Sequence, residues 1–149
     1  MHTDKDFDRW NSKKKRIEAS GDIVGPFPKE GVVWMCSFGV NLGYEQDGTG
    51  IQFERPGLVV KKFNNKMYWV APLSTKQKDL DFYYNFTDPH GIPAAVILAQ
   101  LRLVSIKRFI RDMYYLDEDD FENILASLIN FLRKSKPRTG RGFSRPEGT

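Results

Sequence analysis

Short, mainly apolar segments recur along most of this chain, and polar, turn-forming residues separate them. Such segments, bounded by Gly, Pro, Asn or Asp, have the length and composition of β-strands. The clearest of them cover residues 31–38, 57–63, 67–73, 82–86 and 94–101. Residues 102–104 either continue the last of these or begin another strand, 105–109 fit a single helical turn, and 110–116 predict a final strand. Short strands joined by tight turns indicate a small antiparallel barrel.

Two helices are expected beside these strands. Phe7, Trp10 and Ile17 recur at helical spacing within residues 4–18, so this segment predicts a short N-terminal helix. The second helix follows Asp117, a favourable N-cap, and its acidic first turn suits the positive end of the helix dipole. Its expected apolar stripe consists of Phe121, Ile124, Leu125, Leu128, Ile129 and Leu132. The predicted fold class is therefore mainly β with helices, an α+β arrangement.

The 149 residues are 40% hydrophobic and 13% aromatic, which is enough for one folded domain with its own core. We expect residues 1–20 to form a helical extension, 21–132 the barrel domain, and 133–149 a basic disordered tail. The net charge of +4 is uneven. The tail contributes +5 from six basic and one acidic residue, whereas the barrel carries −3 from 11 basic and 14 acidic residues. An anion site in the barrel must therefore be local.

Composition argues against several classes of protein. There is no apolar run of the roughly 18 residues that a membrane helix needs, and the N-terminus lacks the apolar core of a secretory signal. The single cysteine, Cys36, cannot form an internal disulfide, so a cytoplasmic location is the simple expectation. One Cys and two His without ligand spacing predict neither a metal site nor a cofactor.

The most distinctive polar stretch is the Gly-rich segment within residues 39–54, which we expect to be irregular and mobile. Arg55 and Pro56 follow it directly, at the root of the strand that begins at residue 57. A guanidinium is always charged, and its planar fork of donors fits phosphate oxygens. Arg55 therefore predicts an anion site at the mouth of the loop. The competing interpretation is a structural ion pair with Glu45 or Glu54.

Five short blocks of sequence follow one another in a recognisable order. They are Gly31-Val32-Val33-Trp34, Asn41-x-Gly43-x-Glu45-Gln46-x-Gly48, Arg55-Pro56-x-Leu58-Val59, Ala71-Pro72-Leu73-Ser74-Thr75-Lys76 and the apolar run from Ala95 to Ser105. This order resembles the MazF/PemK toxins of bacterial toxin–antitoxin pairs, and the resemblance covers roughly residues 31–132. Each block alone is weakly specific, whereas five in order are strongly specific. The resemblance implies an SH3-like antiparallel barrel of the CcdB/PemK-like type.

The resemblance also implies an activity. Members of this family work as homodimers and cleave single-stranded RNA, including mRNA, at short sequences without a metal. They leave a 2′,3′-cyclic phosphate and a 5′-hydroxyl, and a cognate antitoxin inhibits them. By resemblance, the catalytic arginine corresponds to Arg55 and its hydroxyl partner to Ser74 or Thr75, whose Ser-Thr order departs from the usual Thr-Ser. The expected RNA-binding residues are Tyr44, Glu45, Gln46, Lys76, Gln100 and Arg102.

Several roles stay open on the sequence. The group that takes the 2′-hydroxyl proton is Glu45, Glu54 or a backbone group, and His90 in its Pro-rich loop is a weaker candidate. Gln100 fits a satisfied buried amide as well as a contact to a base edge. Arg102 fits an ion pair across the sheet as well as a contact to RNA.

A second class of function uses the same barrel. Gyrase-poisoning toxins, and RNA-binding or protein-binding relatives, are non-catalytic binding modules on this fold. The gyrase poisons depend on a C-terminal end of the Trp-Gly-Ile type, whereas this chain ends Pro146-Glu147-Gly148-Thr149. This difference favours the ribonuclease interpretation over the gyrase-type alternative.

Overall fold

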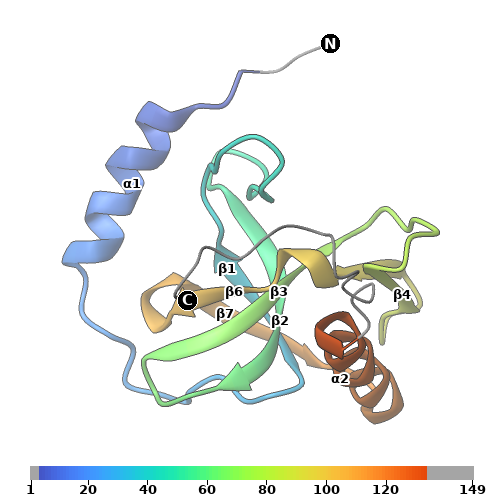
Figure 1. Cartoon of the computed structure of the whole chain (residues 1–149). Helices are drawn as coiled ribbons and strands as arrows, with labels where there is room; N and C mark the ends of the chain where they lie inside the picture. The colour runs from blue at the N-terminus through green and yellow to red at the C-terminus, as the bar shows by residue number, and fades with distance from the viewer. Residues whose placement is uncertain (1–3, 134–149) are drawn as a thin grey trace, which may run out of the picture.

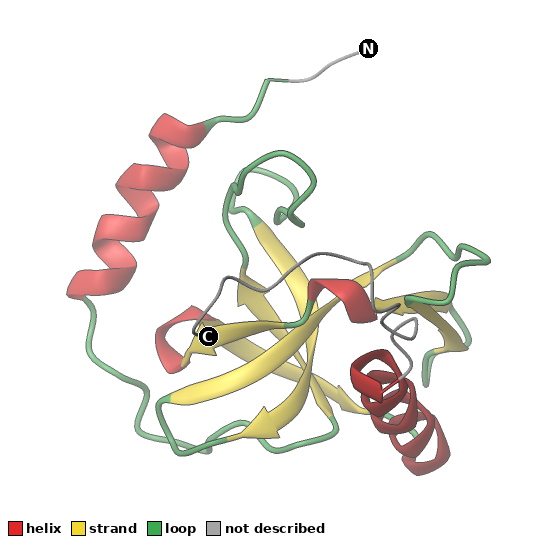
Figure 2. Cartoon of the chain, in the orientation of Figure 1, coloured by secondary structure: helices red, strands yellow, loops and turns green. Residues whose placement is uncertain are grey.

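Seven β-strands, two α-helices and two short 3-10 helices make up residues 4–133, the part of the chain that the computed structural model describes. The strands are β1 (Val32–Ser37), β2 (Glu54–Lys62), β3 (Met67–Ser74), β4 (Tyr83–Thr87), β5 (Pro93–Ile97), β6 (Arg102–Ser105) and β7 (Phe109–Tyr115). The helices are α1 (Phe7–Ala19), η1 (Leu98–Gln100), η2 (Ile106–Arg108) and α2 (Glu118–Arg133). Figure 1 follows these elements along the chain, and Figure 2 separates helix, strand and loop.

The strands form one antiparallel sheet in the order β4-β5-β3-β2-β1-β7, and β6 pairs with β3 beside this path. Two strands, β6 and β5, pair with successive parts of β3. Its first half pairs with β6, where Met67 lies opposite Ser105, and its second half pairs with β5, where Leu73 lies opposite Val96. The sheet is not closed, yet it is broadly barrel-like. The predicted arrangement of a small antiparallel barrel with a helix at each end is confirmed.

The two helices lie on different sides of the strands (Figure 1). α2 buries Ile124 completely in the main core, which includes Leu58 of β2. α1 buries Trp10 in a separate, smaller cluster with Val40 and Phe53. Trp10 therefore packs against the segment between β1 and β2 rather than against the main core.

Two predicted strand boundaries are wrong. β2 begins at Glu54 rather than at residue 57, because β1 pairs with it as far as Ser37 opposite Glu54. The strand predicted over residues 94–101 ends at Ile97, and η1 follows. The chain turns there because it leaves one half of β3 and returns to pair with the other half. The helical turn at residues 106–108 and the final strand are as predicted.

The apolar stripe of α2 is predicted only in part. Ile124 is fully buried, and the stripe residues of the first turns pack against the main core. Ile129 and Leu132 are 49% and 86% exposed, because the end of the helix borders an open apolar groove instead of the core. Asp117 caps the helix as expected, since its Oδ2 accepts a hydrogen bond from the Asp120 amide at 3.2 Å.

Two further expectations concern the division of the chain into domains and the absence of a membrane-spanning helix. The division into extension, barrel and tail stays a prediction, and the tail from residue 134 onward lies outside the described residues. Within residues 4–133, no helix combines the length and the apolar character needed to span a bilayer.

Candidate functional site

Strand pairing brings Arg55 and Ser74 together. Gly57 of β2 lies opposite Pro72 of β3, and Arg55 and Ser74 each lie two residues beyond this last pair. The Nη1 of Arg55 donates to the carbonyl of Leu73, the residue before Ser74. Arg55 and Ser74 line the same cleft, so both residues face one side of the strands. Glu54 precedes Arg55 in β2 and points to the other side, because successive side chains alternate.

Two backbone carbonyls fix the guanidinium of Arg55. Its Nε donates to the Asp47 carbonyl at 2.7 Å, and its Nη1 donates to the Leu73 carbonyl at 2.8 Å. Burial lowers the pKa of Arg55, and the Asp47 carboxylate acts in the opposite direction. The ordinary pKa of arginine is so high that the group stays charged. Asp47 and Leu73 thus set the orientation of the fork, and its remaining N–H donors are left for a ligand.

Arg55 borders a cleft of about 610 Å³ below the Gly-rich loop. The polar and charged residues that line it are Gln46, Thr49, Arg55, Ser74, Thr75, Lys76, Lys78, Tyr83, Asp88 and Tyr114. All three residues expected to be catalytic therefore lie at one cleft, together with Gln46 and Lys76. The lining has three cationic side chains and one carboxylate, so the cleft favours an anion.

Ser74 and Thr75 differ in their surroundings. Ser74 is half-buried at the end of β3, and its Oγ accepts a hydrogen bond from the Lys76 amide at 3.1 Å. An oxygen that accepts in this way still has its own O–H to donate to a ligand. Thr75 is exposed and lies beyond the end of the strand.

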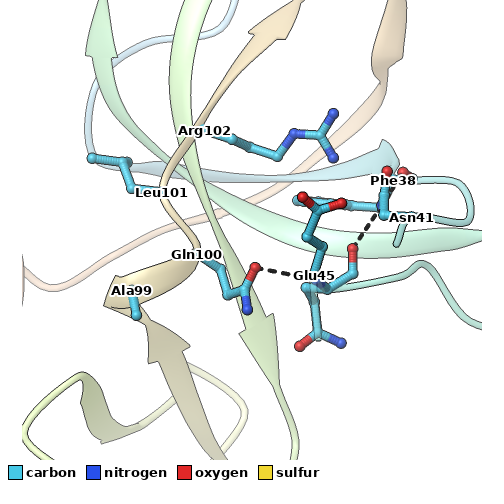
Figure 3. Close-up of a pocket in the computed structure, with 8 residues that line it drawn as sticks. Phe38, Asn41, Glu45, Ala99, Gln100, Leu101 and Arg102 are labelled. Atoms are coloured by element: carbon cyan, nitrogen blue, oxygen red, sulfur yellow. Dashed lines mark hydrogen bonds between the residues drawn. The ribbon is translucent and has the colours of Figure 1, made fainter. Parts of the chain in front are cut away.

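Figure 3 shows a second pocket, of about 400 Å³. It adjoins the cleft, since Gln46 lines both. Glu45 and Arg102 face this pocket, and the guanidinium of Arg102 lies 5.8 Å from the centre of the Phe38 ring. Burial lowers the pKa of Arg102, and the Glu45 carboxylate opposes that effect. Gln100 lines the same pocket. Five of the six residues expected to bind RNA thus line one or both of two neighbouring pockets, and Tyr44 lines neither.

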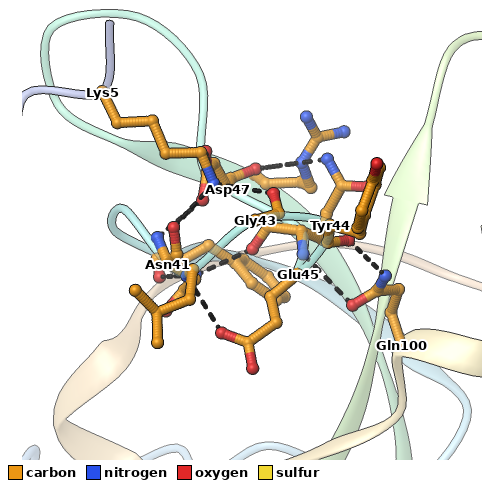
Figure 4. Close-up of polar contacts among 11 residues, drawn as sticks. Lys5, Asn41, Gly43, Tyr44, Glu45, Asp47 and Gln100 are labelled. Carbon is orange, nitrogen blue, oxygen red and sulfur yellow. Dashed lines mark hydrogen bonds and ion pairs between the residues drawn. The ribbon is translucent and has the colours of Figure 1, made fainter.

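The Gly-rich loop is irregular, as predicted, and side chains hold it in place (Figure 4). Gln100 accepts from the Gln46 amide at 3.1 Å and donates to the Tyr44 carbonyl at 3.0 Å. Glu45 accepts from the Leu42 amide at 3.0 Å. Gln100 therefore behaves as a satisfied amide that supports the loop, while the Tyr44 side chain is fully exposed.

The remaining candidates lie away from the cleft or at its edge. Neither Glu45 nor Glu54 is among the residues that line the Arg55 cleft, and Glu54 lies 3.8 Å from the Lys13 amino group. Arg55 bonds backbone carbonyls, and within residues 4–133 it forms no ion pair with either glutamate. His90 is exposed, and its side chain is outside the cleft lining.

Sequence reasoning missed Asp47 and Asp88, and it did not select Tyr83 from the aromatic residues that could contact RNA. Asp47 orients Arg55, and its position in the Gly-rich segment, eight residues before Arg55, was the available signal. Asp88 and Tyr83 reach the cleft through the β4–β5 hairpin. That hairpin joins the site only by pairing β5 with β3, a long-range contact for which no local pattern exists.

The fold is similar to that of solved toxin structures. MazF from Deinococcus radiodurans aligns with a TM-score of 0.63 and 19% identity, covering 73% of this chain and 99% of that one. A MazE-MazF structure from the same organism gives a TM-score of 0.58 at 16% identity, covering 74% of this chain and 100% of that one. An endoribonuclease from Mycobacterial species, in complex with its cognate antitoxin, gives 0.55 at 15% identity, covering 74% and 99%. At these identities the similarity establishes the fold.

Sequence comparison with curated proteins gives no match. The family described as the PemK-like, MazF-like toxin of type II toxin–antitoxin systems matches residues 29–132. This match covers well over half of the chain and contains both pockets and every residue expected in the site. The chain therefore belongs to the PemK/MazF-like toxin family of type II toxin–antitoxin systems.

Proposed function

We propose that this protein is a sequence-selective endoribonuclease that cleaves single-stranded RNA, including mRNA, without a metal ion. The observation that carries the proposal is the juxtaposition of Arg55 and Ser74 at the anion-favouring cleft. The orientation of Arg55 supports it further, because two backbone carbonyls hold the guanidinium before any substrate arrives. Preorganised donors of this kind stabilise charge without a cost of reorganisation during the reaction.

The proposed reaction is an internal transfer at phosphorus. The 2′-oxygen attacks the adjacent phosphorus and loses its proton, while the bond from phosphorus to the 5′-oxygen breaks and that oxygen gains a proton. The products are a 2′,3′-cyclic phosphate and a 5′-hydroxyl. Arg55 stabilises the negative charge that builds on the phosphoryl oxygens, and the Ser74 hydroxyl donates to one of them. Ser74 takes this role rather than Thr75, because it shares the face of Arg55.

The second pocket is proposed to hold a base next to the scissile phosphate. Single-stranded RNA is read through unstacked bases that aromatic and arginine side chains contact. Arg102 and Glu45 supply a donor group and an acceptor group at this pocket, and Tyr44 offers an exposed ring on the loop above. Gln46 and Lys76 are proposed to contact the RNA along the adjoining cleft.

The proposed partners are a cognate antitoxin and a second copy of the chain. The antitoxin is supported by family membership and by relatives that were solved as MazE-MazF, or as an endoribonuclease with its cognate antitoxin. The homodimer rests on the family resemblance. Light scattering of the purified protein, alone and with the candidate antitoxin, measures both assemblies.

The test of the reaction is incubation of the protein with a long single-stranded RNA in EDTA, followed by mapping of the RNA ends. We expect discrete cuts with 5′-hydroxyl ends. Arg55→Ala should lower the rate by about 10²- to 10³-fold, the usual loss when a preorganised donor to an anionic transition state is removed. Ser74→Ala should lower the rate more than Thr75→Ala does.

Arg111→Ala is the matched control, since it removes the same charge from an exposed position on β7 outside the cleft. It should cleave at the wild-type rate. Intact RNA with a folded wild-type protein would contradict the proposal and favour a non-catalytic binding module. Equal cleavage by Arg55→Ala and wild type would remove Arg55 from the reaction.

A further inference from the structure

The segment that leads into α1 reaches across to the Gly-rich loop through one lysine (Figure 4). The Nζ of Lys5 donates to the carbonyls of Asn41 at 2.6 Å and Gly43 at 2.9 Å. The same nitrogen lies 3.3 Å from Oδ2 of Asp47. The Lys5 and Asp47 side chains are only 27% and 28% exposed, so solvent and salt screen this ion pair less than a fully exposed one.

Two further contacts attach α1 to the other end of the loop. Lys13 donates to the Gln52 carbonyl at 2.5 Å and lies 3.8 Å from the Glu54 carboxylate. The Trp10 ring is buried and meets the Phe53 ring edge-on, with the ring centres 5.9 Å apart. The segment from Lys5 to Lys13 therefore holds both ends of the loop, whereas Gln100 supports its middle.

Asp47 connects this attachment to the proposed catalytic group. The Oδ2 of its carboxylate forms an ion pair with Lys5. The Oδ1 accepts a hydrogen bond from the Asn41 amide at 2.6 Å. The backbone carbonyl of Asp47 accepts a hydrogen bond from Nε of Arg55 at 2.7 Å. The position of the Asp47 backbone therefore sets the direction in which the Arg55 fork points. Lys5 is linked to the guanidinium only through Asp47, and it does not line the cleft.

We propose that Lys5 is a positioning residue, and that the α1 segment acts as a clamp that orders the loop and thereby orients Arg55. This inference rests on the proposed ribonuclease function for its effect on rate. α1 lies before the family match of residues 29–132, so this clamp is an addition of this chain to the matched region. Orientation matters here because a misplacement of about 1 Å can cost on the order of 100-fold in rate.

The experiment compares Lys5→Ala, Lys5→Arg and Lys15→Ala in the full chain. Lys15→Ala is the matched control, because Lys15 is exposed on the same helix and has no hydrogen bond or ion pair within residues 4–133. Two quantities are measured: hydrogen exchange of the loop amides without RNA, and kcat and KM for RNA cleavage. The first needs no enzymatic activity, so the clamp and the proposed function can fail separately.

Lys5→Ala should speed exchange of the amides in residues 39–53 by about tenfold, as expected for loss of hydrogen bonds from a charged donor. It should lower kcat by about tenfold and leave KM within about twofold, since orienting a group that acts on the transition state changes the chemical step. Lys5→Arg should restore most of both effects, because it keeps the charge and several donors. Lys15→Ala should match the wild type.

Unchanged loop exchange in Lys5→Ala would overturn the clamp. So would a rise in KM of similar size in Lys5→Ala and Lys15→Ala, because that result would mean that the lysines only attract RNA by charge. A wild-type protein that leaves RNA intact, together with faster loop exchange in Lys5→Ala, would remove the proposed function and keep the coupling between α1 and the loop.

Discussion

The two helices contact the same barrel, but different forces hold them. α2 places Ile124 in the main core, where it is fully buried among residues of several strands. α1 contributes one buried side chain, Trp10, and Ile17 packs partly buried against the same cluster. Its other contacts are polar: Lys5, just before the helix, and Lys13 contact loop carbonyls and carboxylates, and Lys107 donates to the carbonyl of Glu18. A helix with a continuous apolar face stabilises the whole fold, whereas a helix held mainly by polar contacts orders the segment that it touches.

The two helices also differ in their relation to the family. α2 lies within the matched residues 29–132 except for its last residue, Arg133, while α1 precedes them. α2 is therefore part of the domain that the family shares. α1 attaches to the loop that carries the proposed site, so we expect changes in α1 to alter activity and local order more than global stability.

The largest expected change in stability comes from the core of α2. Ile124→Ala should lower the free energy of unfolding by about 2–5 kcal/mol, through lost burial and the cavity that remains. The measurement is urea denaturation, with Ile129→Ala as the control, because Ile129 is 49% exposed on the same helix. If both variants lost a similar free energy of unfolding, the buried and the exposed parts of α2 would contribute equally to stability, against this prediction.

A medium effect is expected where α1 meets the loop. Gly39 has a φ of +77°, and a Cβ added there would lie 2.1 Å from Cε2 of Trp10. Gly39→Ala should therefore displace Trp10, at a local cost of about 1–3 kcal/mol. A red shift of tryptophan fluorescence and faster exchange of the loop amides should report the displacement.

Gly91→Ala separates the clash from backbone strain. Gly91 has a similar φ of +81°, but an added Cβ there meets no atom within 4 Å. It should share the strain of a left-handed residue and leave Trp10 fluorescence unchanged. A global loss of stability in Gly39→Ala equal to that of Ile124→Ala would contradict the view that α1 acts locally.

The smallest effect is expected at a polar contact of α2. The Tyr84 hydroxyl donates to Oδ1 of Asp120 at 2.6 Å and accepts from Nδ2 of Asn123 at 3.3 Å. Tyr84→Phe should cost about 1 kcal/mol near neutral pH. Tyr115→Phe, at an exposed position, is the control and should cost little.

The cost of Tyr84→Phe should depend on pH. Burial and the hydrogen bond to Asp120 raise the pKa of Tyr84 in the folded protein. Its stabilisation is therefore complete below the unfolded pKa of about 10 and is lost as pH rises through the folded pKa. Urea denaturation at pH 8 and above pH 10 should show the difference between wild type and Tyr84→Phe becoming smaller. If the difference in unfolding free energy between wild type and Tyr84→Phe grew above pH 10, it would contradict a raised pKa of Tyr84 in the folded protein.

Most of the elements were predictable because their patterns are local. The strands β1, β3, β4 and β7, the turn η2 and both helices follow from apolar spacing, turn residues and caps. The two wrong strand boundaries lie where partner strands decide where a strand begins or ends. β2 extends back to Glu54 because β1 continues beside it, and the last predicted strand breaks after Ile97 because β3 divides its pairing between β5 and β6. The first helix begins at Phe7 rather than at residue 4, because Asp6 is its N-cap.

The candidate site was predictable in its residue types and less so in its arrangement. Arg55 follows a Gly-rich loop, and that local order predicts that it binds an anion. Its sharing of a face with Ser74 depends on the register between β2 and β3. The contacts of Gln100 with the loop join residues 54 and 56 positions apart in the chain, so no sequence window contains them.

The sequence by itself determined the mainly β fold with two helices, the family, and the residues that carry charge and hydroxyl groups to the loop and strand ends. These follow from short-range patterns and from the order of five blocks along the chain. Only the tertiary structure decided that Asp47 orients Arg55, that Asp88 and Tyr83 line the cleft, and that Lys5 holds the loop. Strand register and side-chain reach across the fold create these contacts, and neither property is encoded at a fixed spacing in the sequence.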